Sequence, residues 1–252
     1  MSATAVLGSP RLHLRCTDST NQRARELAAA GAPHGTLVTA AEQSAGRGRQ
    51  GRSWAAPPGS SLLMSLVLSP APRMLPLAAA LAVCDAVDGA AGAEQRVAAS
   101  IKWPNDVVLE RPPGLAKLAG ILIEARPQQG WSVLGIGLNA ALELEQLPAE
   151  LHDTAATLGL RPEALEPLLR SLLDALSARL SEPRERTLAA WATRDALKGR
   201  RIEWTQPARQ GEATASSGVA AGIDADGRLL VALEDGDQVA LGSGEVHLRP
   251  LS

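Results

Sequence analysis

Apolar residues recur along this chain with two different periods, and the two periods predict different elements. In residues 163–180 leucines recur at steps of three and four, which places them on one face of a helix. Short alternating or continuous apolar runs bounded by Gly or Pro predict strands instead. The predicted strands before residue 160 cover residues 11–15, 36–40, 61–68, 97–101, 106–109, 118–124 and 131–135.

Four segments have the composition and spacing of helices. They cover residues 21–30, 75–90, 163–180 and 184–197. Ser19 and Thr20 are suited to cap the first helix, and Gly31 is suited to end it. Many strands with few helices predict a mixed β-sheet with helices packed on one side, which is an α+β fold or an α/β sandwich.

The pattern changes after Lys198. Short strands are predicted at residues 201–205, 218–223, 228–233 and 237–241. Asp226-Gly227 and Asp235-Gly236 are typical hairpin turns between them. We therefore expect a small C-terminal β-barrel and a division into two domains, residues 1–198 and 199–252.

Composition narrows the possible partners. The chain has 252 residues, a net charge of -2, five Trp and neither Tyr nor Phe, which argues against a nucleic-acid-binding protein. The longest apolar stretch, 74–91, contains Pro76, Asp85 and Asp88 and is too polar to span a bilayer. The N-terminus lacks the pattern of a secretion signal. We expect a cytoplasmic protein with no nucleic-acid or membrane partner.

The two cysteines, Cys16 and Cys84, stand in unrelated contexts. Their spacing fits neither a metal site nor a disulfide framework. Both are expected to be buried, reduced thiols.

A loop rich in Gly and Arg is the most informative stretch. Residues 46–54 read Gly-Arg-Gly-Arg-Gln-Gly-Arg-Ser-Trp. Glycines allow close backbone approach to a ligand, and arginines provide forked donors that match carboxylate or phosphate. The loop indicates an anion site, although an RGG-like nucleic-acid segment or a solvated surface loop remains open. A P-loop is excluded because no Gly-Lys-Ser/Thr follows.

Three further motifs carry polar groups at strand ends or inside strands. Residues 102–106 read Lys-Trp-Pro-Asn-Asp, and a partly buried Lys102 needs an anion, either a ligand or Asp106. Gly120 lies inside an apolar strand and indicates close backbone approach. Asn139 ends a strand, and its amide both donates and accepts hydrogen bonds, as recognition of adenine requires.

In order and spacing these motifs resemble those of biotin protein ligases. The matching segments are Ser19-Thr20-Asn21, Gln43, residues 46–54, residues 102–106, Lys117-x-Ala119-Gly120-Ile121-Leu122-x-Glu124, Gly135-x-Gly137-x-Asn139, Gly222-Ile223-Asp224-x-x-Gly227-x-Leu229 and Gly244-Glu245-Val246. The resemblance covers nearly the whole chain, and the ordered set is specific where single motifs are not. It implies a catalytic domain like that of class II aminoacyl-tRNA synthetases, followed by an SH3-like barrel.

The resemblance also implies a two-step, ATP-dependent reaction. The carboxylate of biotin attacks the α-phosphate of MgATP, which gives biotinyl-5′-adenylate and pyrophosphate. A lysine of the biotin carboxyl carrier protein of acetyl-CoA carboxylase then takes the biotinyl group. The implied catalytic residues are Lys102, Arg47 and Arg49, with Lys102 bridging the carboxylate and the α-phosphate.

Ligand contacts follow from the same resemblance. Biotin would contact Ser19, Thr20, Asn21, Gln43, Arg47, Gly48, Arg49, Lys102, Gly120 and Leu122. ATP would contact Arg47, Arg49, Arg52, Trp54, Lys102, Asn105, Lys117 and Asn139, with Asn139 reading adenine. Asn105 and Asp106 are the candidates for positioning Mg²⁺.

The chain departs from the family pattern at three places. About ten residues precede the first strand, so the DNA-binding domain of some relatives, and with it a repressor role, is expected to be missing. The segment 140–157 has no aromatic residue to stack on adenine, and Gln50 stands where arginine is common.

Other functions remain open beside this one. They are a lipoate-protein ligase, a non-catalytic biotin sensor, and an octanoyl transferase, for which Cys84 in an apolar helix is a poor nucleophile. The sequence leaves the oligomeric state open, and a homodimer is compatible with this fold.

Overall fold

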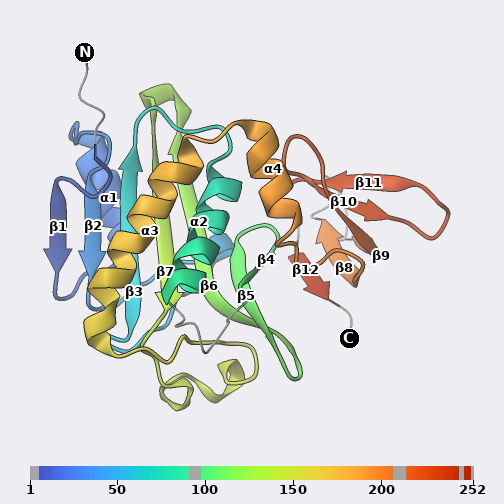
Figure 1. The fold of residues 1–252 in the computed structure, drawn as a ribbon, viewed down its shortest axis with the longest axis horizontal. Coiled ribbons are helices and arrows are strands. Elements are labelled where there is room, and N and C mark those ends of the chain that lie inside the picture. Colours follow the sequence, from blue (N-terminus) through green and yellow to red (C-terminus); the bar gives the residue numbers. More distant parts are fainter. Residues whose placement is uncertain (1–5, 91–97, 207–213, 244–246, 251–252) are drawn as a thin grey trace.

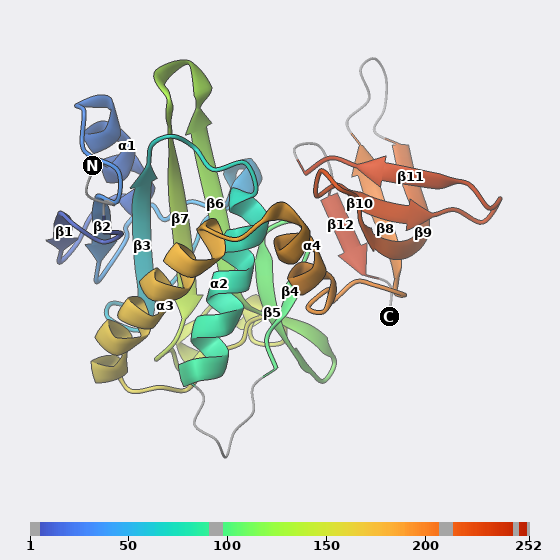
Figure 2. The same ribbon diagram turned by 45° about the horizontal axis from the view of Figure 1, so that its top comes forward.

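The computed structural model describes residues 6–90, 98–206, 214–243 and 247–250, which form two separate β-sheets and four α-helices within these ranges (Figures 1 and 2). The larger sheet has the strand order β1-β2-β3-β7-β6-β5-β4, with β1 and β2 parallel and all other neighbours antiparallel. Its strands are β1 (Arg11–Leu14), β2 (Leu37–Ala40), β3 (Ser61–Leu68), β4 (Ser100–Lys102), β5 (Asp106–Arg111), β6 (Gly114–Arg126) and β7 (Trp131–Asn139). The predicted mixed sheet with helices is confirmed.

Four helices accompany this sheet, and most of them match their predicted bounds. They are α1 (Thr20–Ala29), α2 (Leu75–Ala90), α3 (Leu165–Leu180) and α4 (Arg184–Ala192). Short 3-10 turns lie at η1 (Arg49–Gly51), η2 (Pro127–Gln129), η3 (Leu144–Gln146), η4 (Ala149–Leu151) and η5 (Pro162–Ala164). Figure 1 shows α2 and α3 lying side by side across one face of the sheet.

Helices cover both faces of the sheet, so the prediction of helices on one side is wrong. Leu66 and Leu134 pack in the main core with α2 and α3, whereas their chain neighbours Val67 and Val133 pack with Ala24 of α1. Because side chains alternate along a strand, these two sets point to opposite faces. The central strands are buried on both faces, and such strands need a cover on each side.

The second sheet is antiparallel, with the order β11-β10-β9-β8-β12. Its strands are β8 (Arg201–Gln206), β9 (Thr214–Ile223), β10 (Leu229–Ala232), β11 (Gln238–Leu241) and β12 (His247–Pro250). The last strand was not predicted. Gly227 and Gly236 take φ values of 78° and 92° at the two predicted hairpin turns, where left-handed backbone favours glycine. The Gly244-Glu245-Val246 motif lies outside the described residues.

The main errors in the predicted elements lie where tertiary contacts set the boundaries. Helix α4 ends at Ala192, not Leu197, because the following segment pairs with β4: Ile101 N donates to Arg194 O at 2.6 Å, and Ala196 N donates to Ile101 O at 2.9 Å. Strands β6 and β7 are longer than predicted because β7 pairs with β6 along nearly its full length, and the first half of β6 pairs with β5. Residue 97, the predicted start of β4, lies outside the described residues.

The prediction for the cysteines holds for one of the two. Cys84 is buried in α2, and burial raises its thiol pKa to about 12, which makes it a poor nucleophile. Cys16 is exposed, contrary to the prediction. It lies two residues after Leu14, the last residue of β1, which is an edge strand with incomplete burial.

The second sheet contacts the turn that carries the Lys-Trp-Pro-Asn-Asp motif. Trp103 Nε1 donates to Gly227 O at 3.0 Å, and Arg184 pairs with Asp226 at 3.0 Å.

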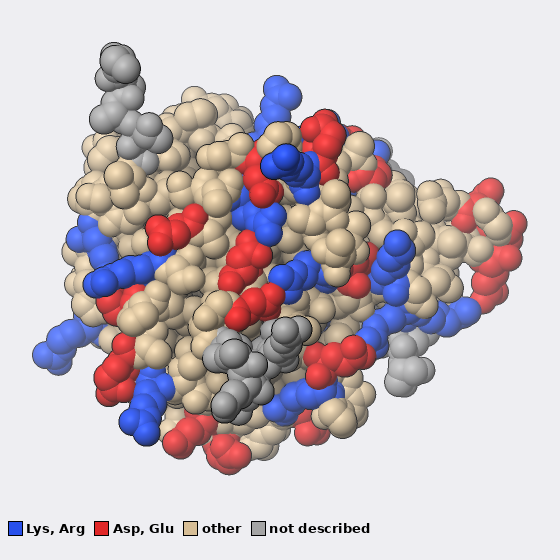
Figure 3. Space-filling model, viewed as in Figure 1, with Lys and Arg blue, Asp and Glu red and all other residues tan. Residues whose placement is uncertain are grey.

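Figure 3 shows basic and acidic side chains interspersed over the face that carries α2 and α3. Within the described ranges, no helix combines the length and apolar character needed to cross a membrane.

Candidate active site

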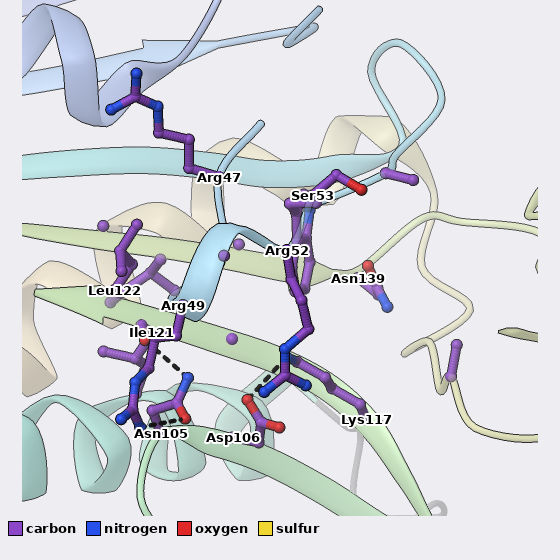
Figure 4. A pocket seen from close by; sticks show the side chains of 18 of the residues that line it. Arg47, Arg49, Arg52, Ser53, Asn105, Asp106, Lys117, Ile121, Leu122 and Asn139 are labelled. Carbon is purple, nitrogen blue, oxygen red and sulfur yellow. Dashed lines mark hydrogen bonds and ion pairs between the residues drawn. The ribbon is translucent and has the colours of Figure 1, made fainter. Parts of the chain in front are cut away.

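One cavity of about 380 Å³ gathers the candidate residues (Figure 4). It lies on the α1 side of the larger sheet, because Gly135, Gly137 and Asn139 share the face of Val133. Its lining includes Ser19, Thr20, Asn21, Gln43, Arg47, Gly48, Arg49, Arg52, Trp54, Lys102, Asn105, Asp106, Lys117, Gly120, Leu122 and Asn139. The structure therefore brings together all the candidate catalytic, biotin-binding, ATP-binding and Mg²⁺ residues selected from the sequence, and their contacts with a ligand stay predictions.

The end of the cavity at α1 is a network of neutral polar groups. The Thr20 backbone N donates to Gln43 Oε1 at 2.7 Å, and the Thr20 hydroxyl donates to the same oxygen at 3.0 Å. Ser65 Oγ donates to Asn21 Oδ1 at 2.6 Å, and Asn21 Nδ2 donates to Glu124 Oε2 at 3.0 Å. These contacts fix the direction of the Asn21 amide without any ligand.

Sequence reasoning gave no role to Ser65 or Glu124, although both hold Asn21. Ser65 has no exposed surface and is flanked by apolar residues of β3. A lone serine in such a strand was the available signal, because a buried hydroxyl needs a partner. Glu124 is also held by Arg25 at 3.0 Å, which ties α1 to β6.

Below the middle of the cavity, glycines of β6 and β7 leave part of the sheet surface, a glycine floor, bare of side chains. Gly120 and Gly137 are paired neighbours across these two strands. A Cβ on Gly137 would lie 2.6 Å from Trp54 Cε2, and one on Gly120 would lie 2.9 Å from Trp54 Cζ3. A Cβ on Gly135 would lie 2.0 Å from Asn21 Oδ1. The expected close approach at Gly120 is confirmed, and the group that approaches is the Trp54 indole.

The Gly-Arg loop is a compact turn above this floor. Gly48 N donates to Arg52 O at 2.6 Å, and Trp54 N donates to Gly46 O at 2.9 Å. Gln50 has a left-handed φ of 56°, so the residue that replaces the usual arginine lies at the tip of the turn. The loop therefore has internal hydrogen bonds even in the empty protein.

The three arginines of the loop have different surroundings. Arg47 and Arg52 are exposed, and Figure 4 shows Arg47 pointing away from Asn105 and Asp106. Arg49 is half-buried, and its guanidinium donates to Asn105 Oδ1 at 3.0 Å and contacts the Ser243 carbonyl beside the second sheet. Burial lowers the pKa of Arg49, with Asp106 opposing this effect. The side chain nevertheless remains charged at neutral pH.

Two of the chain's three lysines line the cavity. Burial is the main cause that lowers the pKa of Lys102; Asp106 raises it, and the nearby charges of Lys117 and Arg52 lower it further. Lys117 Nζ lies 2.8 Å from Asp106 Oδ1, a charge contact without hydrogen-bond geometry, and 5.5 Å from the centre of a Trp54 ring. The close ion pair of Asp106 is thus with Lys117 rather than with Lys102.

The residues considered for Mg²⁺ differ in their availability. Asn105 is engaged at both ends of its amide, since Oδ1 accepts from Arg49 and Nδ2 donates to Ile121 O at 3.0 Å. Among the described residues, the carboxylate of Asp106 has one close charged partner, Lys117. The described residues contain no cluster of three or more His, Cys, Asp or Glu suited to a metal. Asp106 therefore fits a metal that is held mainly by phosphates, and Asn105 does not.

Asn139 closes the opposite end of the cavity. Its Nδ2 donates to Ala156 O at 3.0 Å, and its Oδ1 lies 3.5 Å from Ser61 Oγ. The side chain is only 5% exposed. It ties β7 to the segment 140–156, whose Leu147, Leu151 and Ala155 line the cavity.

A second cavity, of about 350 Å³, adjoins the first. It shares Arg49, Asn105, Ile121 and Leu122 with the first cavity and reaches Gly227 in the second sheet. The two cavities therefore meet at the Arg49 side chain.

A glycine-floored sheet with a neutral polar end and a cationic centre has the form and charge that suit an extended, anion-bearing ligand. Two family models match the chain and identify its class. Residues 13–139 match the Biotin/lipoate A/B protein ligase family, and residues 199–249 match the Biotin protein ligase C terminal domain. The chain belongs to the biotin protein ligases of this family.

Curated relatives and solved structures agree with this membership. The chain is 35% identical over 247 residues to the biotin–[acetyl-CoA-carboxylase] ligase of Mycobacterium tuberculosis, covering 92% of this chain and 87% of that protein. It is 36% identical over 239 residues to the Paracoccus denitrificans enzyme of the same name, covering 88% and 94%. The match to the bifunctional ligase/repressor BirA of Bacillus subtilis, 37% identical, spans 62% of this chain and only 48% of that relative. The biotin protein ligase of Aquifex aeolicus in complex with biotin and ATP has a TM-score of 0.79, 27% identity and coverage of 96% and 100%.

Proposed function

We propose that this chain biotinylates a lysine of a carrier protein, the biotin carboxyl carrier protein of acetyl-CoA carboxylase, through biotinyl-5′-adenylate. The observation that carries the proposal is the order of chemistry along β7. Asn21 lies over Gly135, Trp54 lies over Gly137, and Asn139 ends the strand. At about 3.3 Å per residue, this row is about 13 Å long. It suits a ligand with a polar head, an acidic middle and a base.

The polar end supports biotin over lipoate. Ser19, Thr20, Asn21 and Gln43 offer donors and acceptors that a ureido group can use on both sides. A dithiolane ring offers no equivalent partners, and buried polar groups left unpaired cost binding energy. The related Aquifex protein holds biotin and ATP, which agrees with this assignment.

In the first step, a biotin carboxylate oxygen bonds to the α-phosphorus, and the bond to the bridging oxygen breaks to release pyrophosphate. Two anions must approach each other, so fixed cations are the main device that this chain provides. Lys102 is assigned to bridge the carboxylate and the α-phosphate, with Arg47, Gly48 and Arg49 closing over them. Gly120 and Leu122 offer backbone groups to the biotin tail.

In the second step, the carrier lysine nitrogen bonds to the acyl carbon, AMP leaves, and the nitrogen loses a proton. Arg52, Trp54, Asn105 and Lys117 are assigned to the nucleotide, with Asn139 at the base end. Mg²⁺ would neutralise charge on the triphosphate, with Asp106 as the side chain that fits it.

We also propose the finer features of the architecture. They are a class II synthetase-like domain over residues 1–198, an SH3-like barrel over residues 199–252, a cytoplasmic location and a fold compatible with a homodimer. Thermal unfolding of the 1–198 fragment and sedimentation of the full chain would test the domain division and the oligomeric state.

A pyrophosphate-release assay with biotin or lipoate, followed by transfer to a purified carrier domain, tests the proposed function. We expect pyrophosphate release only with biotin, and then biotin on the carrier lysine. Release with lipoate alone would make the chain a lipoate ligase. Biotin binding without release would make it a sensor.

A further inference from the structure

Lys102 ends a very short strand at the edge of the larger sheet. Strand β4 has three residues and is the last strand in the sheet order. On its inner side it pairs with β5 from Ser100 to Lys102. The backbone groups of successive residues point to alternate sides of a strand, and those of Ile101 point outward, away from β5. So short a strand, paired on one side only, would hold Lys102 weakly.

The outer side of β4 is covered by residues 194–196, the segment that follows α4. Ile101 N donates to Arg194 O at 2.6 Å, and Ala196 N donates to Ile101 O at 2.9 Å, which makes Asp195 the parallel partner of Ile101. Ile101 is fully buried, so its backbone groups depend on these bonds. Segment 194–196 is therefore the second support of the strand that carries Lys102.

The Arg194 side chain fastens this segment to the core. Its Nη2 donates to Asp88 Oδ2 in α2 at 2.6 Å, and its Nη1 donates to Ala99 O, just before β4, at 3.0 Å. Asp88 Oδ1 is buried without a hydrogen-bond partner among the described residues, so this carboxylate relies on Arg194. The hydrogen bond with Asp88 raises the pKa of Arg194, which stays charged. One guanidinium thus joins α2 to the entry of β4.

We propose that Arg194 is a positioning residue of the ligase: it sets the place of Lys102 in the cavity through Ala99 and Ile101 and does not touch a ligand. Arg194 lines neither of the two cavities described above. A fixed cation acts only where charge develops, and a misplacement of about 1 Å can cost about 100-fold in rate. The inference rests on the proposed function and on Lys102 as the bridging cation.

The first test is the single-turnover rate of pyrophosphate release from biotin and ATP. Arg194→Met should lower this rate by about 10- to 100-fold. Arg179→Met is the matched control, because Arg179 forms a similar partly buried pair with Asp85, one helical turn before Asp88 in α2, but joins α2 to α3 rather than to β4. Equal losses in the two variants would show a general effect of stability and overturn the inference.

A double-mutant cycle separates positioning from a merely structural role. Lys102→Met removes the group on which Arg194 is proposed to act. If Arg194 acts through Lys102, adding Arg194→Met to Lys102→Met should lower the rate no further than about twofold. A structural role would lower the rate by the same factor in both backgrounds, and that result overturns the inference while the ligase function stands.

Arg194→Lys keeps the test usable if Arg194→Met does not fold. A lysine can pair with Asp88, but its ammonium lacks the fork that also reaches Ala99 O. We expect a smaller loss than in Arg194→Met, and this loss should again disappear in the Lys102→Met background. A loss that persists there, or a wild-type rate in a folded Arg194→Met, overturns the inference. Absence of pyrophosphate release by the wild-type protein overturns the proposed function instead.

Discussion

The polar end of the cavity and the Gly-Arg loop achieve recognition in different ways. Around Asn21, neutral groups hold one another through Ser65 and Glu124, so their geometry exists before a ligand arrives. Residues 46–54 instead place three arginines of like charge on one short turn, two of them exposed. Specificity is thus built into packed elements, whereas charge neutralisation is left to a loop whose arginines gain most when an anion is present.

The largest expected effect comes from removing charge at the cavity centre. Lys102→Met should reduce adenylate formation about 100-fold, which corresponds to about 3 kcal/mol in the transition state. Without ligand, Lys102→Met should be at least as stable as the wild type at neutral pH. Burial lowers the pKa of Lys102, which means that folding makes its charged form less favourable. Pyrophosphate release and thermal unfolding measure the two effects.

The pH dependence of stability gives a further check on Lys102. Between its lowered pKa and the ordinary value of 10.5, the unfolded chain binds more protons than the folded chain. The free energy of unfolding should therefore rise with pH through that window in the wild type, and this rise should be smaller in Lys102→Met. Lys198→Met, at an exposed lysine outside the cavity, is the control. Normal adenylation by folded Lys102→Met, with loss in Lys117→Met, would move the bridging role to Lys117.

A substitution in the polar network around Asn21 should have the next largest effect. Asn21→Ala removes one hydrogen bond each from Ser65 and Glu124, which keep Thr20 and Arg25 as partners, and removes a contact predicted for biotin. We expect a cost on the order of 2 kcal/mol, seen as an increase of about 30-fold in the KM for biotin with an unchanged KM for ATP. Gln22→Ala, at the next residue of α1 and on its surface, is the matched control. Equal increases in both KM values would show that the network does not act on biotin specifically.

Limited trypsin digestion tests whether the Gly-Arg loop, unlike the Asn21 network, is open without ligand. Arg47 and Arg52 are exposed, so cleavage there should be fast in the empty protein, whereas Arg49, held by Asn105, should be cut later. Biotin with ATP should slow cleavage at all three sites by about tenfold or more, because proteolysis follows the population of open loop. Equally slow cleavage without ligand would mean that the loop is as preformed as the Asn21 network.

The smallest effect is expected at Ser19. This residue lies at the N-cap of α1, but its side chain makes no capping hydrogen bond. A working serine cap contributes about 1 kcal/mol, so Ser19→Ala should change stability by less than about 0.5 kcal/mol. Denaturant unfolding checks this, and a tenfold weaker affinity for biotin in the same variant would assign the hydroxyl to the ligand. A loss of stability equal to that of a working cap would argue for a structural role.

Local sequence signals were enough to predict elements whose bounds depend mainly on their own and flanking residues. Strand β3 and helix α2 have the predicted bounds, because Gly or Pro punctuation and apolar content fix them locally. The candidate residues lie far apart in the chain, and their order and spacing predicted that they meet in one cavity. What each residue contacts in a ligand is still a prediction.

Features that depend on pairing between distant segments escaped prediction. The end of α4 is set by the contact of residues 194–196 with β4, and no local signal marks it. The second covered face of the sheet follows from α1, whose few buried alanines give only a weak periodic pattern. The ion pair between Asp106 and Lys117 depends on the register of β5 and β6, which the sequence does not reveal.

The indole laid across the glycine floor also gives this protein a built-in optical reporter. The chain has five Trp and neither Tyr nor Phe, so tryptophan alone supplies its aromatic emission and near-ultraviolet dichroism. Four of these residues, Trp103, Trp131, Trp191 and Trp204, are buried. Trp54 alone lines the main cavity, beside the Lys117 ammonium. A change in emission on adding a ligand can therefore be attributed to this one position by comparison with Trp54→Leu, without attaching any dye.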